Sequence, residues 1–194
     1  MYPEVKADGT IGKCDFSRYD AMIDDFVAAG MPLERVKLGF FLAWDAWGFK
    51  NCGLMHKNFP KAVKLYFAEM TSHFQKKYGI GLDRIIFSTI DEPSGKISDK
   101  KSSMYKAWLA AKIIKEANPK YLTKTNPLPS QLVKGIDEDL PELMKYYDIL
   151  EIYRPMFTDK LAKKLLANNK TIWTYGIYGT TTAPAVYRGD LWKN

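Results

Sequence analysis

The sequence contains 194 residues, of which 46% are hydrophobic, so it can form one domain with a sizeable core. Its formal net charge is +7, but the lysines are spread along the predicted helices, a pattern typical of solvated helix faces and not of a nucleic-acid-binding surface. No apolar segment is long enough to span a membrane. The first residues lack the apolar core of a signal peptide, so the cellular location stays open, including a secreted or periplasmic parent protein.

Helices and strands are predicted to alternate along most of the chain. Apolar residues recur at helical spacing from Asp15 and again from Phe59, and glycine or proline residues end these segments. Short segments rich in β-branched and aromatic residues lie between the helices and are typical of buried strands. The predicted helices are residues 15–30, 59–77, 102–117, 140–146 and 158–167, and the predicted strands are residues 36–44, 84–90, 121–125, 147–153 and 171–175.

This alternation predicts an α/β fold in which about five parallel strands form part of a (β/α)8 TIM barrel. No glycine-rich phosphate-binding motif follows the first predicted strand, which favours a barrel over a doubly wound nucleotide-binding sheet. A closed barrel has eight strands and usually ~250 residues, so five strands correspond roughly to the second or third unit through the seventh. We expect residues 1–194 to be a single, incomplete barrel domain.

The predicted strand 84–90 leads directly to two adjacent acids, Asp91 and Glu92, which are followed by Pro93. Proline cannot donate to a sheet and restricts the residue before it, so strand pairing must end here. Ligands bind at the carboxyl ends of parallel strands in α/β proteins, which makes the two acids a candidate site. The alternative is that they are solvated loop residues, as most adjacent acids are.

Aromatic and polar residues stand at the ends of the other predicted strands and are candidates for the walls of a substrate site. They are Trp44, Asn126, Tyr153, Trp173 and Tyr175. Each of them could instead cap the barrel core or bind a loop. Cysteine and histidine are too sparse for a metal site, and Cys14 and Cys52 are compatible with either a disulfide or two free thiols. We therefore expect neither a metal nor an organic cofactor.

Several motifs carry a family resemblance: Asp8-Gly9-Thr10, residues 15–20, Asp91-Glu92-Pro93, Tyr153-Arg154-Pro155, Trp173-Thr174-Tyr175, and Arg188 with Trp192. With these motifs the sequence resembles the domain of glycoside hydrolase family 123 and a related group of uncharacterised glycosidase-like barrels. The resemblance covers most of the chain, and the acid pair is its chemically specific part. Members are N-acetyl-β-galactosaminidases or uncharacterised relatives, and their domain extends beyond both ends of this sequence.

The resemblance implies a retaining, substrate-assisted hydrolysis of β-linked N-acetylhexosaminides, N-acetylgalactosaminides above all. Asp91 would orient the substrate's acetamido group, whose oxygen attacks C1. Glu92 would protonate the leaving oxygen and then act as the base for water. Because neighbouring side chains on a regular strand point to opposite faces, this scheme requires the chain to leave the pleat at Asp91.

Other functions stay open at this point. A conventional retaining glycosidase needs a second carboxylate about 5–5.5 Å away on another strand, and Glu151 is the acid closest to a predicted strand end. A non-catalytic carbohydrate-binding fragment could use the same aromatic residues. A truncated barrel could also be inactive, because missing strands leave sheet edges exposed. In each case the expected partner is a carbohydrate, with no nucleic acid and no membrane, and the oligomeric state is open.

Overall fold

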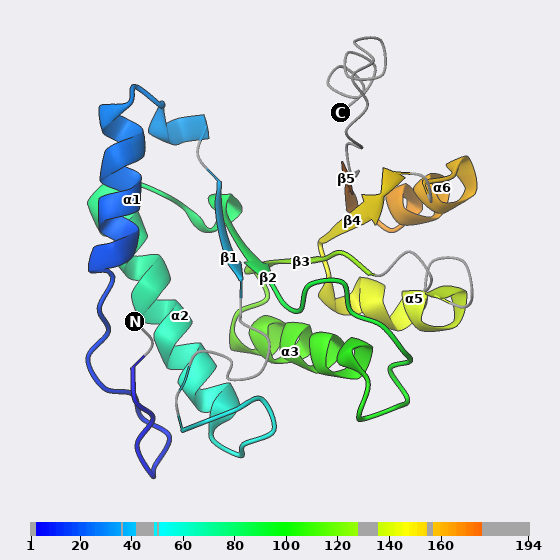
Figure 1. Cartoon of the computed structure of the whole chain (residues 1–194), viewed down its shortest axis with the longest axis horizontal. Helices are drawn as coiled ribbons and strands as arrows, with labels where there is room; N and C mark the ends of the chain where they lie inside the picture. Colours follow the sequence, from blue (N-terminus) through cyan, green and yellow to red (C-terminus); the bar gives the residue numbers. More distant parts are fainter. Residues whose placement is uncertain are drawn as a thin grey trace, which may run out of the picture.

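The computed structural model describes residues 3–35, 37–41, 49, 51–127, 136–154 and 157–175. In these residues five strands alternate with helices, as predicted (Figure 1). The strands are β1 (Leu38–Phe41), β2 (Ile85–Ser88), β3 (Leu122–Thr125), β4 (Ile149–Tyr153) and β5 (Thr171–Tyr175). The α-helices are α1 (Ser17–Ala28), α2 (Phe59–Tyr78), α3 (Ser103–Ala117), α5 (Ile136–Tyr146) and α6 (Asp159–Ala167).

The strands form one parallel sheet in which each strand pairs with its neighbours along the chain. The order is β1-β2-β3-β4-β5. Figure 1 shows the helices following one another around the outside of the strands, from α1 beside β1 to α6 beside β4 and β5. This arrangement is a section of a (β/α) barrel, and all strands end with their carboxyl termini at the same rim.

Local signals in the sequence account for the helix boundaries. A proline lies in the first turn of α2, and Gly79 ends this helix with φ 65°, in the left-handed region that favours glycine. The Ser102 side chain accepts a hydrogen bond from the Tyr105 amide and caps α3. Thr158 caps α6 in the same way through the Leu161 amide. Each cap satisfies an amide that would otherwise have no partner within the helix.

The core lies between the sheet and its helices and is built largely from aromatic rings. Phe87 on β2 stacks on Phe67 of α2 with ring centroids 4.2 Å apart, and Phe40 on β1 stacks on Phe74 at 5.7 Å. A second apolar cluster joins α3, α5 and α6 to β4, where Leu150 and Ile152 face the helices. These contacts show which side of each strand faces the helices. The alternate residues therefore face the inside of the barrel.

Helix α1 is attached to α2 by charged side chains. Asp20 lies 2.7 Å from the His73 ring nitrogen Nε2 and 2.9 Å from Lys77 Nζ. Partial burial of Asp20 by itself would raise the pKa of its carboxyl group. The hydrogen bonds and positive charges of the two basic neighbours outweigh this effect and hold the pKa below its ordinary value.

The structure corrects three predicted boundaries. The strand predicted over 84–90 ends at Ser88, and the strand predicted over 147–153 begins at Ile149. Tyr147 is fully buried; its hydroxyl donates to the Ala107 carbonyl oxygen at 2.7 Å and accepts from Thr89 Oγ1 at 2.7 Å. Helix α5 begins at Ile136, earlier than predicted, because the acids before Leu140 suit the positive end of a helix. Residues 36 and 42–44 of the first predicted strand, 36–44, lie outside the described residues.

Both cysteines are free thiols, so the open question of a disulfide is answered. Burial raises the pKa of Cys14 to about 12, with a further contribution from the Glu69 carboxylate, and burial also raises the pKa of Cys52. Neither thiol is therefore a nucleophile at neutral pH. The helices that the structure describes include none with the length and apolar character of a membrane span.

Candidate functional site

The inner face of the sheet carries polar and aromatic side chains along its last three strands. Apolar packing places Leu150, Ile152 and Ile172 on the helix side, so the alternate positions of β4 and β5 face inward. The inward-facing residues of β3, β4 and β5 and of the loop after β3 include Lys124, Asn126, Glu151, Tyr153, Trp173 and Tyr175. Pairing places Glu151 opposite Trp173 and Tyr153 opposite Tyr175.

The acid pair lies just beyond the end of β2. After Ser88 the chain leaves the strand geometry, and Asp91 is half-buried whereas Glu92 is exposed. Glu92 has φ 45°, in the left-handed region that residues other than glycine seldom adopt. The following Pro93 is buried and disfavours the right-handed helical geometry for Glu92. The requirement that the chain leave the pleat before the two acids is thus met.

Asn126, directly after β3, binds both acids. Its side-chain nitrogen Nδ2 donates to Asp91 Oδ1 at 2.5 Å, and its oxygen Oδ1 accepts from the Glu92 amide at 3.4 Å. Asn126 is only 8% exposed, so its amide is held in place and is directed at the acid pair. One asparagine therefore orients the Asp91 carboxylate and also the backbone that carries Glu92.

Tyr175, at the end of β5, contacts the side chain of Glu92. Its hydroxyl donates to Glu92 Oε1 at 3.2 Å. The ring of Tyr175 also contacts that of Tyr153, with centroids 5.5 Å apart. Burial, the hydrogen bond to Glu92 and the nearby carboxylates all raise the pKa of the Tyr175 phenol. The phenol therefore stays protonated at neutral pH and acts as a hydrogen-bond donor.

An ion pair lies on the same inner face, two residues before Asn126 on β3 and two residues before Tyr153 on β4. Lys124 Nζ lies 2.5 Å from Glu151 Oε2 and 5.7 Å from the centroid of the Trp173 ring. The two charged side chains are 12% and 21% exposed, respectively. Among the inward-facing strand positions that the structure describes, Glu151 is the only acid, and its carboxylate is engaged by the lysine.

Four of the five predicted wall residues thus lie on the inner face with the acid pair nearby. Asn126 and Tyr175 contact the acids directly, whereas Tyr153 and Trp173 contact Tyr175 and Lys124, respectively. Trp44 lies outside the described residues, as do Pro155, Arg188 and Trp192 of the family motifs. Residues 51–127 and the other described segments contain no cluster of His, Cys, Asp and Glu suited to a metal ion.

Sequence reasoning missed the Lys124–Glu151 ion pair. A spacing of two residues could have indicated it, because alternate residues of a strand face the same side. Lys124 lies two residues before Asn126, and Glu151 lies two residues before Tyr153. This spacing places the ion pair on the same face of the sheet as the predicted wall. The pairing itself also depends on the β3–β4 register, which the sequence does not show.

Comparison with known proteins supports the fold but assigns no family. No protein-family model matches the sequence, and no curated protein matches it. Among solved structures, the chain is similar to a psychrophilic glycoside hydrolase family 10 endo-beta-1,4-xylanase, with a TM-score of 0.52 and 14% sequence identity. The alignment covers 98% of this chain and 69% of the xylanase chain. This chain therefore has the fold of part of a TIM-barrel glycoside hydrolase.

Proposed function

We propose that residues 1–194 form one incomplete barrel domain of a glycoside hydrolase that cleaves β-linked N-acetylhexosaminides, with N-acetylgalactosaminides favoured. The observation that carries the proposal is the acid pair at the rim of the sheet, in which Asn126 orients Asp91 and Tyr175 holds Glu92. The fold similarity to a glycoside hydrolase supports the class of reaction, and the family 123 resemblance supports the substrate.

In the proposed reaction, Asp91 acts on the acetamido group of the substrate and Glu92 acts on the leaving oxygen. Asp91 orients the acetamido N–H of the substrate and stabilises the positive charge that develops there. The acetamido oxygen attacks C1 while Glu92 gives its proton to the leaving oxygen, so that the glycosidic bond breaks as the C1–O bond of the oxazolinium ion forms. Water then attacks C1 and gives a proton to Glu92, which opens the ring and restores the acetamido group.

The Lys124–Glu151 ion pair favours this scheme over a conventional one with two carboxylates. A nucleophile must be free to attack C1, whereas Glu151 is mostly buried and bound to Lys124. Releasing it would break a charge-assisted contact between two half-buried side chains. With Glu151 engaged, the substrate's own acetamido group becomes the more suitable nucleophile.

The proposal is tested by the release of nitrophenol from aryl N-acetyl-β-galactosaminide and aryl β-galactoside. We expect release from the first and none from the second, because only the first carries the 2-acetamido group. Glu92→Gln keeps the side-chain volume and should abolish release, since general acid catalysis contributes about 10²- to 10⁴-fold. Equal cleavage of the two substrates would contradict substrate assistance, and unchanged turnover in Glu92→Gln would exclude Glu92 as the acid.

A non-catalytic carbohydrate-binding role is the second candidate, because Tyr153, Tyr175 and Trp173 form a partly exposed aromatic set on the inner face. Calorimetric titration with N-acetylgalactosamine distinguishes the two functions. Binding by the wild-type chain without hydrolysis of the aryl glycoside would favour the binding module.

A further inference from the structure

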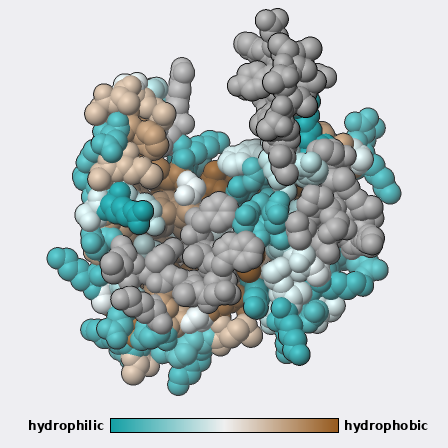
Figure 2. All heavy atoms as spheres, in the orientation of Figure 1, coloured by the Kyte–Doolittle hydropathy of each residue, from teal (hydrophilic) through white to brown (hydrophobic). Residues whose placement is uncertain are grey.

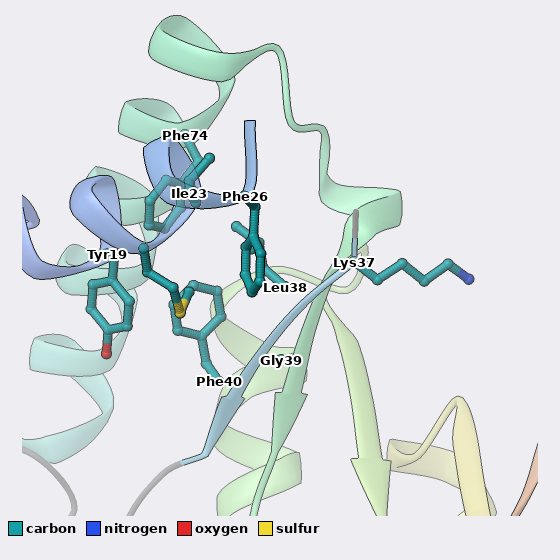
Figure 3. A pocket seen from close by; sticks show the side chains of 9 residues that line it. Tyr19, Ile23, Phe26, Lys37, Leu38, Gly39, Phe40 and Phe74 are labelled. Carbon is teal, nitrogen blue, oxygen red and sulfur yellow. The ribbon is translucent and has the colours of Figure 1, made fainter. Parts of the chain in front are cut away.

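The cleft between α1 and β1 is lined largely by apolar side chains. It has a volume of about 230 Å³, and Figure 3 shows Phe26 and Phe40 at its wall, with the Lys37 side chain extending away from it. Figure 2 shows apolar residues gathered at the upper left, over α1. A site that acts on a substrate also needs polar groups that fix its geometry. Buried polar groups of this kind lie near the strand ends that carry the acid pair.

Tyr147 has a fully buried hydroxyl that no step of the proposed reaction uses. It follows α5 and precedes β4 in the chain, and it belongs to the apolar cluster that joins these elements to α3. Its hydroxyl donates to the Ala107 carbonyl oxygen on α3 at 2.7 Å and lies 2.7 Å from Thr89 Oγ1. Burial raises the pKa of the phenol, so it stays protonated at neutral pH.

The direction of these two hydrogen bonds is fixed by the groups that form them. A tyrosine hydroxyl has one proton to donate, and a carbonyl oxygen can only accept. Tyr147 gives its proton to Ala107, so the Thr89 hydroxyl must be the donor in the second bond. Thr89 is also fully buried, and a buried donor that loses its partner is not compensated by water. The bond therefore holds the Thr89 side chain toward α3.

The backbone connects this buried hydroxyl to the acid pair. Thr89 is the first residue after β2 and lies two residues before Asp91. Thr125, the last residue of β3, has its side chain close to the same Tyr147 hydroxyl, and Asn126 follows it directly. Tyr147 thus adjoins the two segments that lead to the contact between Asn126 Nδ2 and Asp91 Oδ1, which are 2.5 Å apart.

We propose that Tyr147 is a positioning residue for the acid pair. By holding Thr89 it sets where the chain leaves the direction of β2. It thereby sets how Asp91 and Glu92 meet Asn126. The left-handed conformation of Glu92, with φ 45°, persists only where the surrounding structure holds it, and a buried anchor three residues earlier contributes to this. The expected effect on turnover rests on the proposed function, whereas the effect on the geometry of the acid pair does not.

The first measurement needs no substrate. The side-chain amide of Asn126 gives a signal in nitrogen–proton NMR spectra, and Asn126→Ala identifies this signal by its loss. Its position reports the hydrogen bond to Asp91. In Tyr147→Phe, which keeps the ring and removes the hydroxyl, we expect the signal to shift toward those of solvent-exposed asparagine amides. The matched control is Tyr78→Phe, which removes a hydroxyl with two hydrogen bonds to α1 and should leave the signal in place.

The second measurement is turnover of aryl N-acetyl-β-galactosaminide. We expect Tyr147→Phe to lower kcat about 10- to 100-fold with little change in KM, because misplaced catalytic groups affect the transition state more than substrate binding. Thr89→Val removes the other hydroxyl of the same bond and should have the same effect. The double variant should lose no more than either single variant, since both changes remove one interaction. Tyr78→Phe should keep the wild-type kcat.

Circular dichroism checks that the variants are folded, and Thr89→Val takes the place of Tyr147→Phe if the latter does not fold. An Asn126 signal that stays in place in the folded variants would overturn the proposal, whatever the activity. An unchanged kcat in Tyr147→Phe, or an equal loss of kcat in Tyr78→Phe, would also overturn it and would leave the proposed hydrolysis intact. A wild-type chain without turnover whose Asn126 signal still shifts in Tyr147→Phe would contradict the hydrolysis and support the positioning role.

Discussion

Replacing Asn126 by aspartate tests the proposed geometry of the acid pair without any substrate. The change keeps the shape of the side chain but places a carboxylate where Nδ2 now donates to Asp91 at 2.5 Å. It removes a hydrogen bond to a charged group, worth about 1.5–3 kcal/mol. It also adds a repulsion between the new carboxylate and that of Asp91. At a separation of about 4 Å and an effective dielectric constant of about 20 this repulsion is about 4 kcal/mol. The partial exposure of Asp91 to solvent reduces it. We expect the variant to be destabilised by about 2–4 kcal/mol at neutral pH.

The pH dependence of this loss identifies its cause. In the variant, a proton shared between the two adjacent carboxyl groups removes the repulsion and restores a hydrogen bond. The variant should therefore lose stability as the pH rises and regain it as the pH falls to about 5. Denaturant unfolding followed by tryptophan fluorescence at about pH 5 and pH 7.5 measures the difference. Asn126→Ala is the control, because it removes the bond without adding a charge and should show no such recovery. A loss in Asn126→Asp that does not change with pH would refute the proposed contact.

Three further predictions concern other contacts. Tyr175→Phe removes the donor to Glu92 and should lower kcat on aryl N-acetyl-β-galactosaminide about 3- to 10-fold, less than Glu92→Gln; an unchanged kcat would remove Tyr175 as a positioning residue. Asp20 has a lowered pKa in the folded state, so its stabilising effect exists at neutral pH and is lost on acidification. In Asp20→Asn the free energy of unfolding should therefore depend less on pH below about pH 5. The same acid dependence in the variant and the wild-type chain would contradict this. Phe87→Ala should destabilise the fold by about 3–5 kcal/mol in denaturant unfolding, because this fully buried ring stacks on Phe67, and a loss below about 1 kcal/mol would contradict that packing.

The elements of this fold were predictable because each has a local cause. The apolar stripe of α2 repeats every three or four residues, and Gly79 ends the helix close to the predicted boundary at residue 77. Pro93 located the end of strand pairing to within a few residues, although β2 stops earlier, at Ser88. Thr89 has a strand-like sequence but lies just beyond β2, where its hydroxyl contacts that of the buried Tyr147 at 2.7 Å.

The contacts within the site were not predictable, because they join residues far apart in the chain. Asn126 and Asp91 are separated by 35 positions, and Lys124 and Glu151 by 27. Which pairs meet depends on the register between neighbouring strands, and a shift of one residue would move each side chain to the other face. Register is set by packing against the helices, which periodicity in a single sequence does not reveal.

The order of the sheet has a consequence for how the protein is made. Each of the five described strands pairs with the strands before and after it in the chain, so none of these five has to be threaded between two others. During synthesis each new helix and strand can add to the edge that the previous unit has just left exposed. At every intermediate length the growing sheet then exposes a free edge, and that edge can pair with another chain. The time for which an edge stays open, set by the pace of translation, should therefore govern how much of the nascent protein aggregates.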